Sequence, residues 1–425
     1  MRPKSRWYLF AAHHTGAVAF LLSVLWLSQP SPVLAQQPRV AFVTSIQGTA
    51  DLGSWPDAGS EVGAAAGDAI CRARATAAGL ANPESFVAWL STSTDDAYCR
   101  LHGLTGTKAA NCGEVELPVN AGPWMRADGL PFSESIDQLL APESVVYYLL
   151  EVDEFGVTID LNDLSIFTLT TESGELGFGS NCGEWADTPV ESTRGGLGYY
   201  GSNGWTTALT SISCQSEARL YCFERTAGPP LPPRPAAGAV AFVTSVAGQG
   251  DLGAWPDAGG ETGIAAGDAI CQARAAAGGL ERPDEFKAWL SDSTTHAIER
   301  FEDPGARIRP DGVRIADSLA DLTDGKLDAT LNVDELGNYI GNSAAWTGTN
   351  ASGQLLGSAC ADWASASDTQ QGRAGSVWNS SGNWTQVFSF DCDGFDRLYC
   401  IADPAPVFVD GFESGDLAAW TSTTP

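Results

Sequence analysis

The stretch GDAICRARATAAGLANPESFVAWLS, residues 67–91, returns as GDAICQARAAAGGLERPDEFKAWLS at residues 267–291. It is the centre of a longer repeat, because residues 41–91 and 241–291 align without a gap at a shift of 200, with 35 of 51 positions identical. A repeat of this length corresponds to a whole domain rather than to a solenoid unit of about 20 to 50 residues. The sequence therefore predicts two domains, each with its own core.

The repeat itself predicts a strand, a loop, a helix and a second strand. Residues 41–45 and 241–245 are apolar and β-branched, which is typical of the first strand of each domain. A loop rich in Gly, Asp and Pro follows. The apolar positions of 65–78 fall on one helical face, and Gly79 stands where a C-terminal cap is expected. The alternating pattern of 85–91 predicts a strand.

After residue 90 the two copies differ in length, because the first carries about 17 extra residues that include Cys99 and Cys112. The later cysteines align again. The segment TAGPPLPPRPAA predicts a semi-extended, proline-rich linker between the copies. The predicted organisation is a first domain at 39–225, a linker at 226–238, a second domain at 239–402 and a C-terminal tail at 403–425.

The N-terminus has the pattern of a secretory signal peptide. Three basic residues lie within the first six positions, and an apolar run spans 17–27. In Val33-Leu34-Ala35, small residues stand at the positions that a signal peptidase reads, which predicts cleavage after Ala35. An uncleaved anchor is the alternative, but the run is shorter than the roughly 20 residues of a membrane span. We therefore expect residues 1–35 to be a signal peptide and the protein to be secreted or held at the cell surface.

The composition narrows the class of partner. The formal net charge is −29, and removing residues 1–35, with three basic and no acidic side chains, would bring it to −32. Such a field repels nucleic acid, heparin-like polyanions and anionic lipid. High solubility in an extracellular medium is the simpler reason for the charge.

Ten cysteines divide as six in the first domain and four in the second. Even numbers in an exported chain predict a disulfide framework. Zinc binding is the competing interpretation, but there is no C-x-x-C spacing, and only His102 and His296 follow the signal peptide. Four cysteines allow three pairings, and their spacing does not choose among them.

Several motifs, taken as a set, resemble the endostatin-like branch of the C-type-lectin-like fold. They are GDAIC-x-ARA with a following GL, FKAWLS, the Asp311-Gly312 pair, WTGT at Trp346, CADW at Cys360 and the closing LYC. The segment LADLTDGKLDATLNVDELG at 319–337 is similar to segments of an uncharacterised family of secreted bacterial domains. The resemblance covers both copies. It implies an α+β fold made of two tandem C-type-lectin-like domains, with mixed, mainly antiparallel sheets, flanking helices and disulfides.

The resemblance also implies a pairing of the cysteines. An outer disulfide would join the first helix to the last strand and enclose an inner one, and the insertion would hold a fifth. The implied pairs are Cys71 with Cys222, Cys182 with Cys214, Cys99 with Cys112, Cys271 with Cys400, and Cys360 with Cys392. The zinc-binding histidines and clustered arginines of endostatin have no counterpart here, nor have the calcium-site motifs of true C-type lectins. The resemblance therefore implies a fold and no ligand.

Catalytic chemistry has weak signals. The paired carboxylates Asp153-Glu154 and Asp334-Glu335 match between the copies, but adjacent strand residues point to opposite faces, which favours a structural role. The run DCDGFD at 391–396 has some calcium-loop character without the full loop pattern. There is no G-x-S-x-G, H-E-x-x-H or phosphate-binding loop. We expect no enzyme, no metal and no cofactor; a hydrolase working with carboxylates alone is a minor alternative.

The function we expect is recognition or adhesion, without catalysis, of an extracellular glycan or protein; a structural cell-surface component is the alternative. The candidate ligand-binding residues are Trp346 and Trp378, in loops rich in Asn, Ser and Gly, which suit recognition. The sequence aligns Trp346 with Thr168 and Trp378 with Tyr199-Tyr200. Neither is a fixed tryptophan of the repeat, whereas two tryptophan pairs, 185 with 363 and 205 with 384, recur and are expected in the core.

Overall fold

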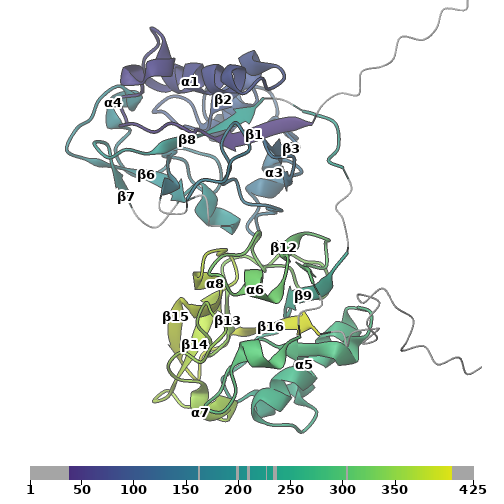
Figure 1. Cartoon of the computed structure of the whole chain (residues 1–425). Helices are drawn as coiled ribbons and strands as arrows, with labels where there is room; N and C mark the ends of the chain where they lie inside the picture. Colours follow the sequence, from purple (N-terminus) through teal and green to yellow (C-terminus); the bar gives the residue numbers. More distant parts are fainter. Residues whose placement is uncertain are drawn as a thin grey trace, which may run out of the picture. The chain divides into compact units, whose positions relative to one another are not determined.

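A computed structural model describes residues 38–160, 163–197, 201–207, 211–225, 227–232, 237–302 and 305–403 (Figure 1). The predicted signal peptide at 1–35 and the predicted tail beyond Asp403 lie outside these residues, as do parts of the linker. Both copies combine a mixed sheet with one long and several short helices, so the α+β class that the sequence predicts is confirmed. Within the described part of the chain, no helix has the length and apolar composition needed to cross a bilayer.

The first copy is built from eight strands and four α-helices among its described residues. They are β1 (Arg39–Val43), α1 (Gly63–Ala77), β2 (Phe86–Ala88), α2 (Ala97–Leu101), β3 (Trp124–Arg126), β4 (Pro131–Ser133), α3 (Ile136–Leu139), β5 (Ser165–Phe167), α4 (Cys182–Trp185), β6 (Ser192–Leu197), β7 (Ser211–Ser213) and β8 (Arg219–Glu224). Short 3-10 turns join several of them.

The second copy repeats the order of strands. Its elements are β9 (Ala239–Val243), α5 (Gly263–Ala277), β10 (Phe286–Ala288), β11 (Arg307–Ile308), β12 (Arg314–Ala316), α6 (Leu319–Leu322), β13 (Ala344–Trp346), α7 (Cys360–Trp363), β14 (Gln371–Ser376), α8 (Asn383–Gln386), β15 (Phe388–Asp391) and β16 (Arg397–Ala402). The helix and strands predicted from the repeat are confirmed, with boundaries shifted by one to three residues.

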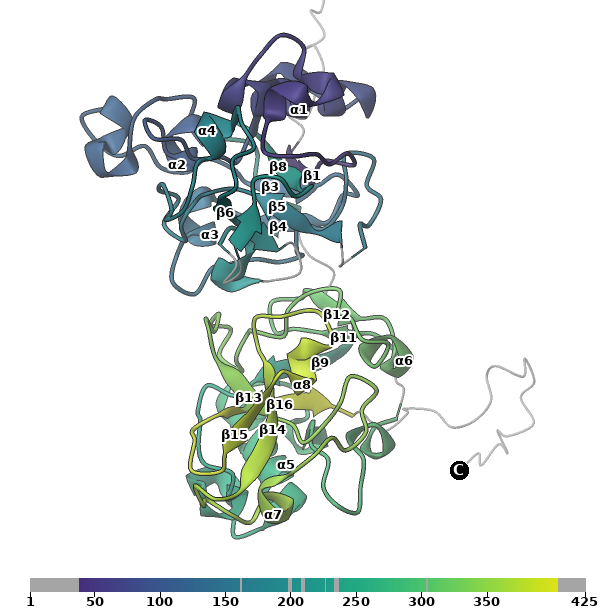
Figure 2. The same cartoon turned by 90° about the vertical axis from the view of Figure 1, so that its left-hand side faces the viewer.

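The last strand of each copy is the centre of its sheet. In the first copy the order is β4-β3-β1-β8-β5-β6-β7, with β2 also paired to β8, and the second copy has the equivalent order. β1 with β3 and β5 with β8 are parallel, and the other pairs are antiparallel. The predicted mixed, mainly antiparallel sheet is therefore confirmed. Figure 2 shows β13, β14 and β15 side by side in the second copy.

The long helix of each copy packs closely on its sheet. In α1 the buried residues include Ile70, Cys71 and Ala75, which lie on one face. Gly67 belongs to the same face, and a Cβ atom there would lie 2.9 Å from a methyl carbon of Leu90, so only glycine allows this approach. Beyond the helix Gly79 has a φ of +69°, and the N–H of the following residue donates back into the last turn.

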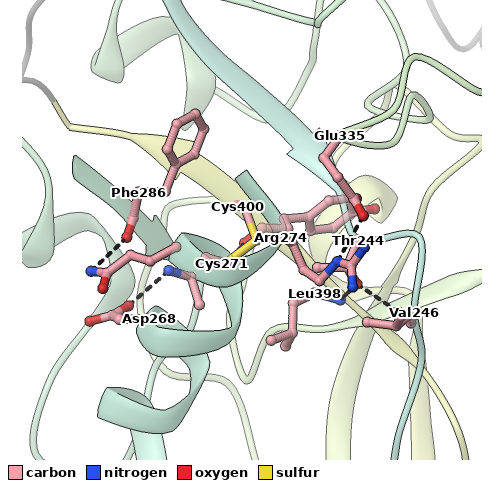
Figure 3. Close-up of a disulfide and its surroundings, with 12 residues drawn as sticks. Thr244, Val246, Asp268, Cys271, Arg274, Phe286, Glu335, Leu398 and Cys400 are labelled. Atoms are coloured by element: carbon pink, nitrogen blue, oxygen red, sulfur yellow. Dashed lines mark hydrogen bonds and ion pairs between the residues drawn. A yellow bond between two sulfur atoms is a disulfide. The ribbon is translucent and has the colours of Figure 1, made fainter. Parts of the chain in front are cut away.

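All five disulfides implied by the resemblance are present, and no free cysteine remains. The outer bond of the second copy joins Cys271 on α5 to Cys400 on β16, as Figure 3 shows. The inner bond joins Cys360 on α7 to Cys392 directly after β15. The outer disulfide therefore fixes the long helix to the central strand of the sheet. The inner disulfide fixes the short helix α7 to the end of the edge strand β15.

Apolar side chains cover both faces of each sheet. In the first copy one cluster lies between α1 and the sheet, and another contains Trp89, Trp124 and Phe223. The second copy has the equivalent two clusters. The recurring tryptophans, 185 with 363 and 205 with 384, are all at most 2% exposed, which confirms that they are core residues.

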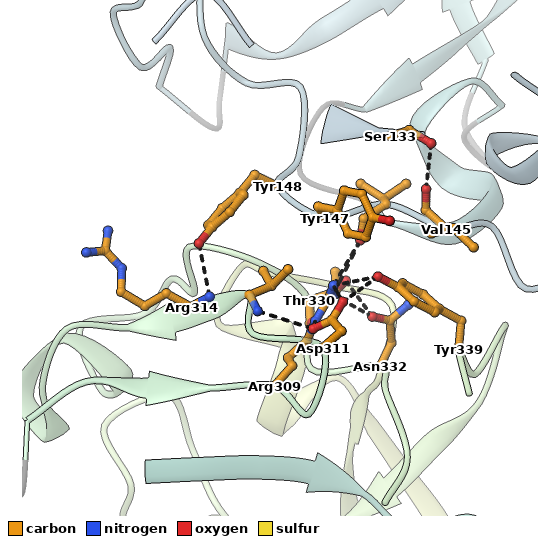
Figure 4. Close-up of polar contacts among 12 residues, drawn as sticks. Ser133, Val145, Tyr147, Tyr148, Arg309, Asp311, Arg314, Thr330, Asn332 and Tyr339 are labelled. Carbon is orange, nitrogen blue, oxygen red and sulfur yellow. Dashed lines mark hydrogen bonds and ion pairs between the residues drawn. The ribbon is translucent and has the colours of Figure 1, made fainter. Parts of the chain in front are cut away.

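One segment of the first copy contacts the second (Figure 4). The carbonyl of Val146 accepts a hydrogen bond from Arg309 at 3.3 Å, and the hydroxyl of Tyr148 accepts one from the backbone N–H of Arg314 at 3.0 Å. Arg309 is fully buried and also pairs with Asp311 at 2.7 Å. Burial alone would raise the pKa of Asp311, but the charge of Arg309 and its hydrogen bonds outweigh burial and lower it to about 2. The linker therefore joins two copies that share polar contacts.

Candidate functional site

Trp346 is a core residue, so its prediction as a ligand-binding residue is wrong. Its side chain is fully buried, and its indole N–H donates to the carbonyl of Gly248 at 3.0 Å. The strand register pairs Trp346 with Leu398, as Phe167 pairs with Leu220 in the first copy. The structural counterpart of Trp346 is thus Phe167 and not Thr168. A one-residue error in the alignment made a shared core aromatic look like a new surface residue.

Trp378 is only partly buried and remains a candidate. It lies two residues after the end of β14, and its carbonyl accepts a hydrogen bond from the N–H of Gly201 at 2.8 Å. Its ring packs against the apolar cluster of the second copy that contains Trp289 and Trp384. Tyr199 and Tyr200, with which the sequence aligned it, lie outside the described residues. Trp378 therefore has a packing role on one side and some exposed surface on the other.

The paired carboxylates have structural partners. Asp334 accepts hydrogen bonds from the backbone N–H groups of Leu336 and Asn338 at 2.9 and 2.8 Å, and so holds a turn. Glu335 is fully buried at its side chain and accepts from Arg274 and from the backbone N–H of Ser245. Asp153 and Glu154 repeat these contacts in the first copy. The two carboxylates of each pair point to different partners and form no shared site.

The acidic run at 391–396 also separates. Asp391 and Asp393 are exposed, whereas Asp396 is 9% exposed and lies in a backbone bridge with Gly248. Burial raises the pKa of Asp396 to about 6. The run therefore places its carboxylates in different environments, which is unlike a calcium loop.

A different group of carboxylates has oxygen atoms within 4.8 Å of one another: Asp317, Asp321 and Asp328. Arg314 already lies among them, at 2.5 Å from Asp317 and 2.9 Å from Asp328. Asp321 accepts a hydrogen bond from the backbone N–H of Asp317 at 2.6 Å. The guanidinium of Arg314 balances the negative charge of these carboxylates, and the backbone N–H of Asp317 donates a hydrogen bond to one of them.

A polar hollow in the second copy is the best candidate for a binding site. Its volume is about 500 Å³, and it lies between α7, the start of β14 and the end of β15. The lining residues are exposed and mostly polar: Ser358, Ala361, Asp368, Thr369, Gln370, Gln371 and Asp391. They offer carboxylate, amide and hydroxyl groups on one concave surface.

The walls of the hollow are fixed by covalent and hydrogen bonds. The disulfide between Cys360 and Cys392 joins α7 to the end of β15, so it connects the two sides. The backbone N–H of Cys392 donates to the carbonyl of Gln370 at 2.8 Å, and the amide of Gln371 donates to Asp391 at 3.3 Å. Polar side chains on a rigid support lose little conformational entropy when they bind a ligand.

The sequence located this region but not these residues. The hollow lies around the inner disulfide of the second copy, Trp346 and Trp378 are absent from its lining, and its side chains come from three segments separated by up to about 30 residues. Only the distribution of Asp, Gln, Thr and Ser around the inner cysteines could have indicated them. Neither the known protein-family models nor the curated proteins include a match to this chain.

Proposed function

We propose that this protein is a secreted recognition or adhesion protein that binds an extracellular ligand through its second copy and does not catalyse a reaction. The observation that carries the proposal is the polar hollow beside the Cys360–Cys392 disulfide. Its chemistry favours a glycan, because carboxylate and amide groups can pair with the hydroxyls of a sugar. The net charge of −29 disfavours sulfated or otherwise anionic glycans.

We further propose that both copies are C-type-lectin-like domains of the endostatin-like branch. The proposal is supported by the outer disulfide from the long helix to the last strand, the inner disulfide near the sheet edge, and the central position of the last strand. In such folds the loops around the inner disulfide form the usual recognition face. The polar hollow lies in these loops.

Export is part of the same proposal. Five disulfides are typical of chains that fold in an oxidising compartment. The basic and apolar pattern of residues 1–35 agrees with this. A secreted, acidic and cross-linked protein suits persistence outside the cell.

Binding to an array of neutral and acidic glycans and of extracellular matrix proteins tests the proposal. Asp391→Asn and Gln371→Ala should weaken binding about tenfold each, since a lost hydrogen bond to a ligand costs roughly 1 kcal/mol or more. Asp393→Asn is the matched control, because this acid is also exposed and lies two residues away but does not line the hollow. Equal binding by all variants, or no binding on the array, would reject the hollow as the site.

A further inference from the structure

The second copy has an open groove where the first copy is filled. The groove has a volume of about 570 Å³ and lies along β9, β10 and the end of β16. Half of its lining residues are apolar, among them Val240, Leu280, Phe286 and Ile308. The charged lining residues are Glu281, Arg282, Glu285 and Arg309.

In the first copy, two large side chains occupy the equivalent place. Arg39 forms an ion pair with Glu224 at 2.5 Å, and the Glu224 side chain is 2% exposed. The side chain of Asn82 donates a further hydrogen bond to Glu224 at 3.0 Å. The equivalent positions in the second copy are Ala239 and Ala402, which line the open groove. The loss of these two side chains explains the opening.

In the first copy, Ala227 and Gly228, which follow β8, also cover the position that corresponds to the groove. The carbonyl of Ala227 accepts a hydrogen bond from Arg39 at 3.1 Å, and the N–H of Gly228 donates to the carbonyl of Gly122 at 2.7 Å. The backbone lies so close that a Cβ atom on Gly228 would be 2.7 Å from the Arg39 side chain. The downstream chain therefore completes the surface of the first copy.

The chain leaves the last strand of the second copy in the same direction. The N–H of Asp403 donates to the carbonyl of Glu285 at 3.0 Å, as that of Arg225 donates to Ser85 at 3.1 Å. The carboxylate of Asp403 is held by Lys287 at 2.5 Å. Ala402, at the end of β16, lines the groove, and the sequence after Asp403 reads PAPVFV at residues 404–409.

We propose that residues 404–409 dock in this groove and take the place that Ala227 and Gly228 have in the first copy. Pro406 stands at the position of Gly228 and has no N–H, so it cannot repeat the bond to a backbone carbonyl. Apolar contact has to hold the segment instead, and Val407 and Phe408 provide the side chains that an apolar groove accepts. The following acidic residues then emerge at a fixed point on the second copy.

Hydrogen exchange on the full chain tests the proposal. Phe408→Ala should raise the exchange rate of the backbone amides of Val240 and Ile308 by tenfold or more, because the variant removes the largest apolar contact of the docked segment. Phe412→Ala, further along the tail and outside 404–409, is the control and should leave these rates unchanged. Equal rates in all three proteins, or equal effects of both variants, would overturn the proposal.

A second variant fills the groove from within. Ala239→Arg together with Ala402→Glu recreates the ion pair of the first copy, and thermal melting verifies that the protein still folds. The amides of Val407 and Val409 should then exchange at least tenfold faster than in the parent, because their site is occupied. Unchanged protection of these amides in the folded double variant would show that the segment binds elsewhere or not at all.

Discussion

The carboxylate of Glu335 lies 2.8 Å from the Nε atom of Arg274, and its side chain is fully buried (Figure 3). The same carboxylate accepts a hydrogen bond from the backbone N–H of Ser245, two residues after the end of β9. Glu154 and Arg74 repeat the pair in the first copy. This ion pair connects the long helix to the turn that begins at Asp334-Glu335, so the paired carboxylates have a structural role in both copies.

Replacing Glu335 by Ala should lower the free energy of unfolding of the second copy by about 3 kcal/mol. Among the described residues, the variant leaves Asp257 as the ionic partner of the partly buried Arg274, and breaking one side of a buried ion pair typically costs about 3 to 5 kcal/mol. Urea unfolding followed by tryptophan fluorescence measures the change. Asp393→Asn, at an exposed acid, is the control and should shift the free energy by less than about 0.5 kcal/mol.

The outer disulfides should stabilise more than the insertion disulfide. Cys271 and Cys400 are 129 residues apart, whereas Cys99 and Cys112 are 13 apart. The chain-entropy model then gives losses of about 5 and about 3 kcal/mol when each pair is changed to Ala. Urea unfolding of both double variants under oxidising conditions measures the difference. Equal losses would show that native packing, and not loop closure, sets the contribution.

Asp396 should make the protein less stable as the pH rises from about 4 to about 6. Burial raises its pKa to about 6 in the folded protein, whereas an unfolded Asp titrates near 4. Between these values the folded state binds more protons, so the free energy of unfolding falls with rising pH and levels off above 6. Asp396→Asn should remove this slope and raise stability at pH 7 by about 2 kcal/mol.

The two candidate tryptophans should respond differently to replacement by Ala. Trp346→Ala should cost about 3 to 5 kcal/mol, because it leaves a large cavity in the core, while binding per folded molecule stays unchanged. Trp378→Ala should cost clearly less, since this side chain is only partly buried. Thermal melting and ligand binding are measured on the same samples. A Trp346 variant that keeps its melting temperature would contradict the structure.

Residues 239–402 should fold when expressed alone under oxidising conditions, because this segment has its own sheet, two disulfides and two apolar clusters. Its stability should be lower than in the full chain, since Tyr147 and Tyr148 of the first copy belong to one of those clusters. Far-ultraviolet circular dichroism and thermal melting check this. An insoluble or unfolded product would show that the first copy is required.

The sequence predicted the elements that occur in both copies. It did not predict features that depend on contacts between residues far apart in the chain. The helix around Cys71, the strands beside it and the five disulfides followed from the duplication and the resemblance. The burial of Trp346 was not predicted, because it depends on a strand register that pairs Ala345 with Arg397. An alignment error of one residue changes that register, and the sequence alone does not reveal the error. The groove in the second copy could not be predicted either. Ala239 and Ala402 replace Arg39 and Glu224 of the first copy, but the sequence does not show that these two side chains pack against each other.

The first and last strands of each copy are antiparallel neighbours, with Phe242 paired to Cys400 in the second. A pull on the two ends of the second copy would therefore unzip these strands one hydrogen bond at a time, which needs little force. The Cys271–Cys400 bond stops this lengthening, because everything between its two cysteines is closed into a loop. Only the roughly 30 residues before Cys271 can extend, by about 100 Å at 3.3 to 3.6 Å per residue. A domain built in this way yields under load by a fixed length and then holds.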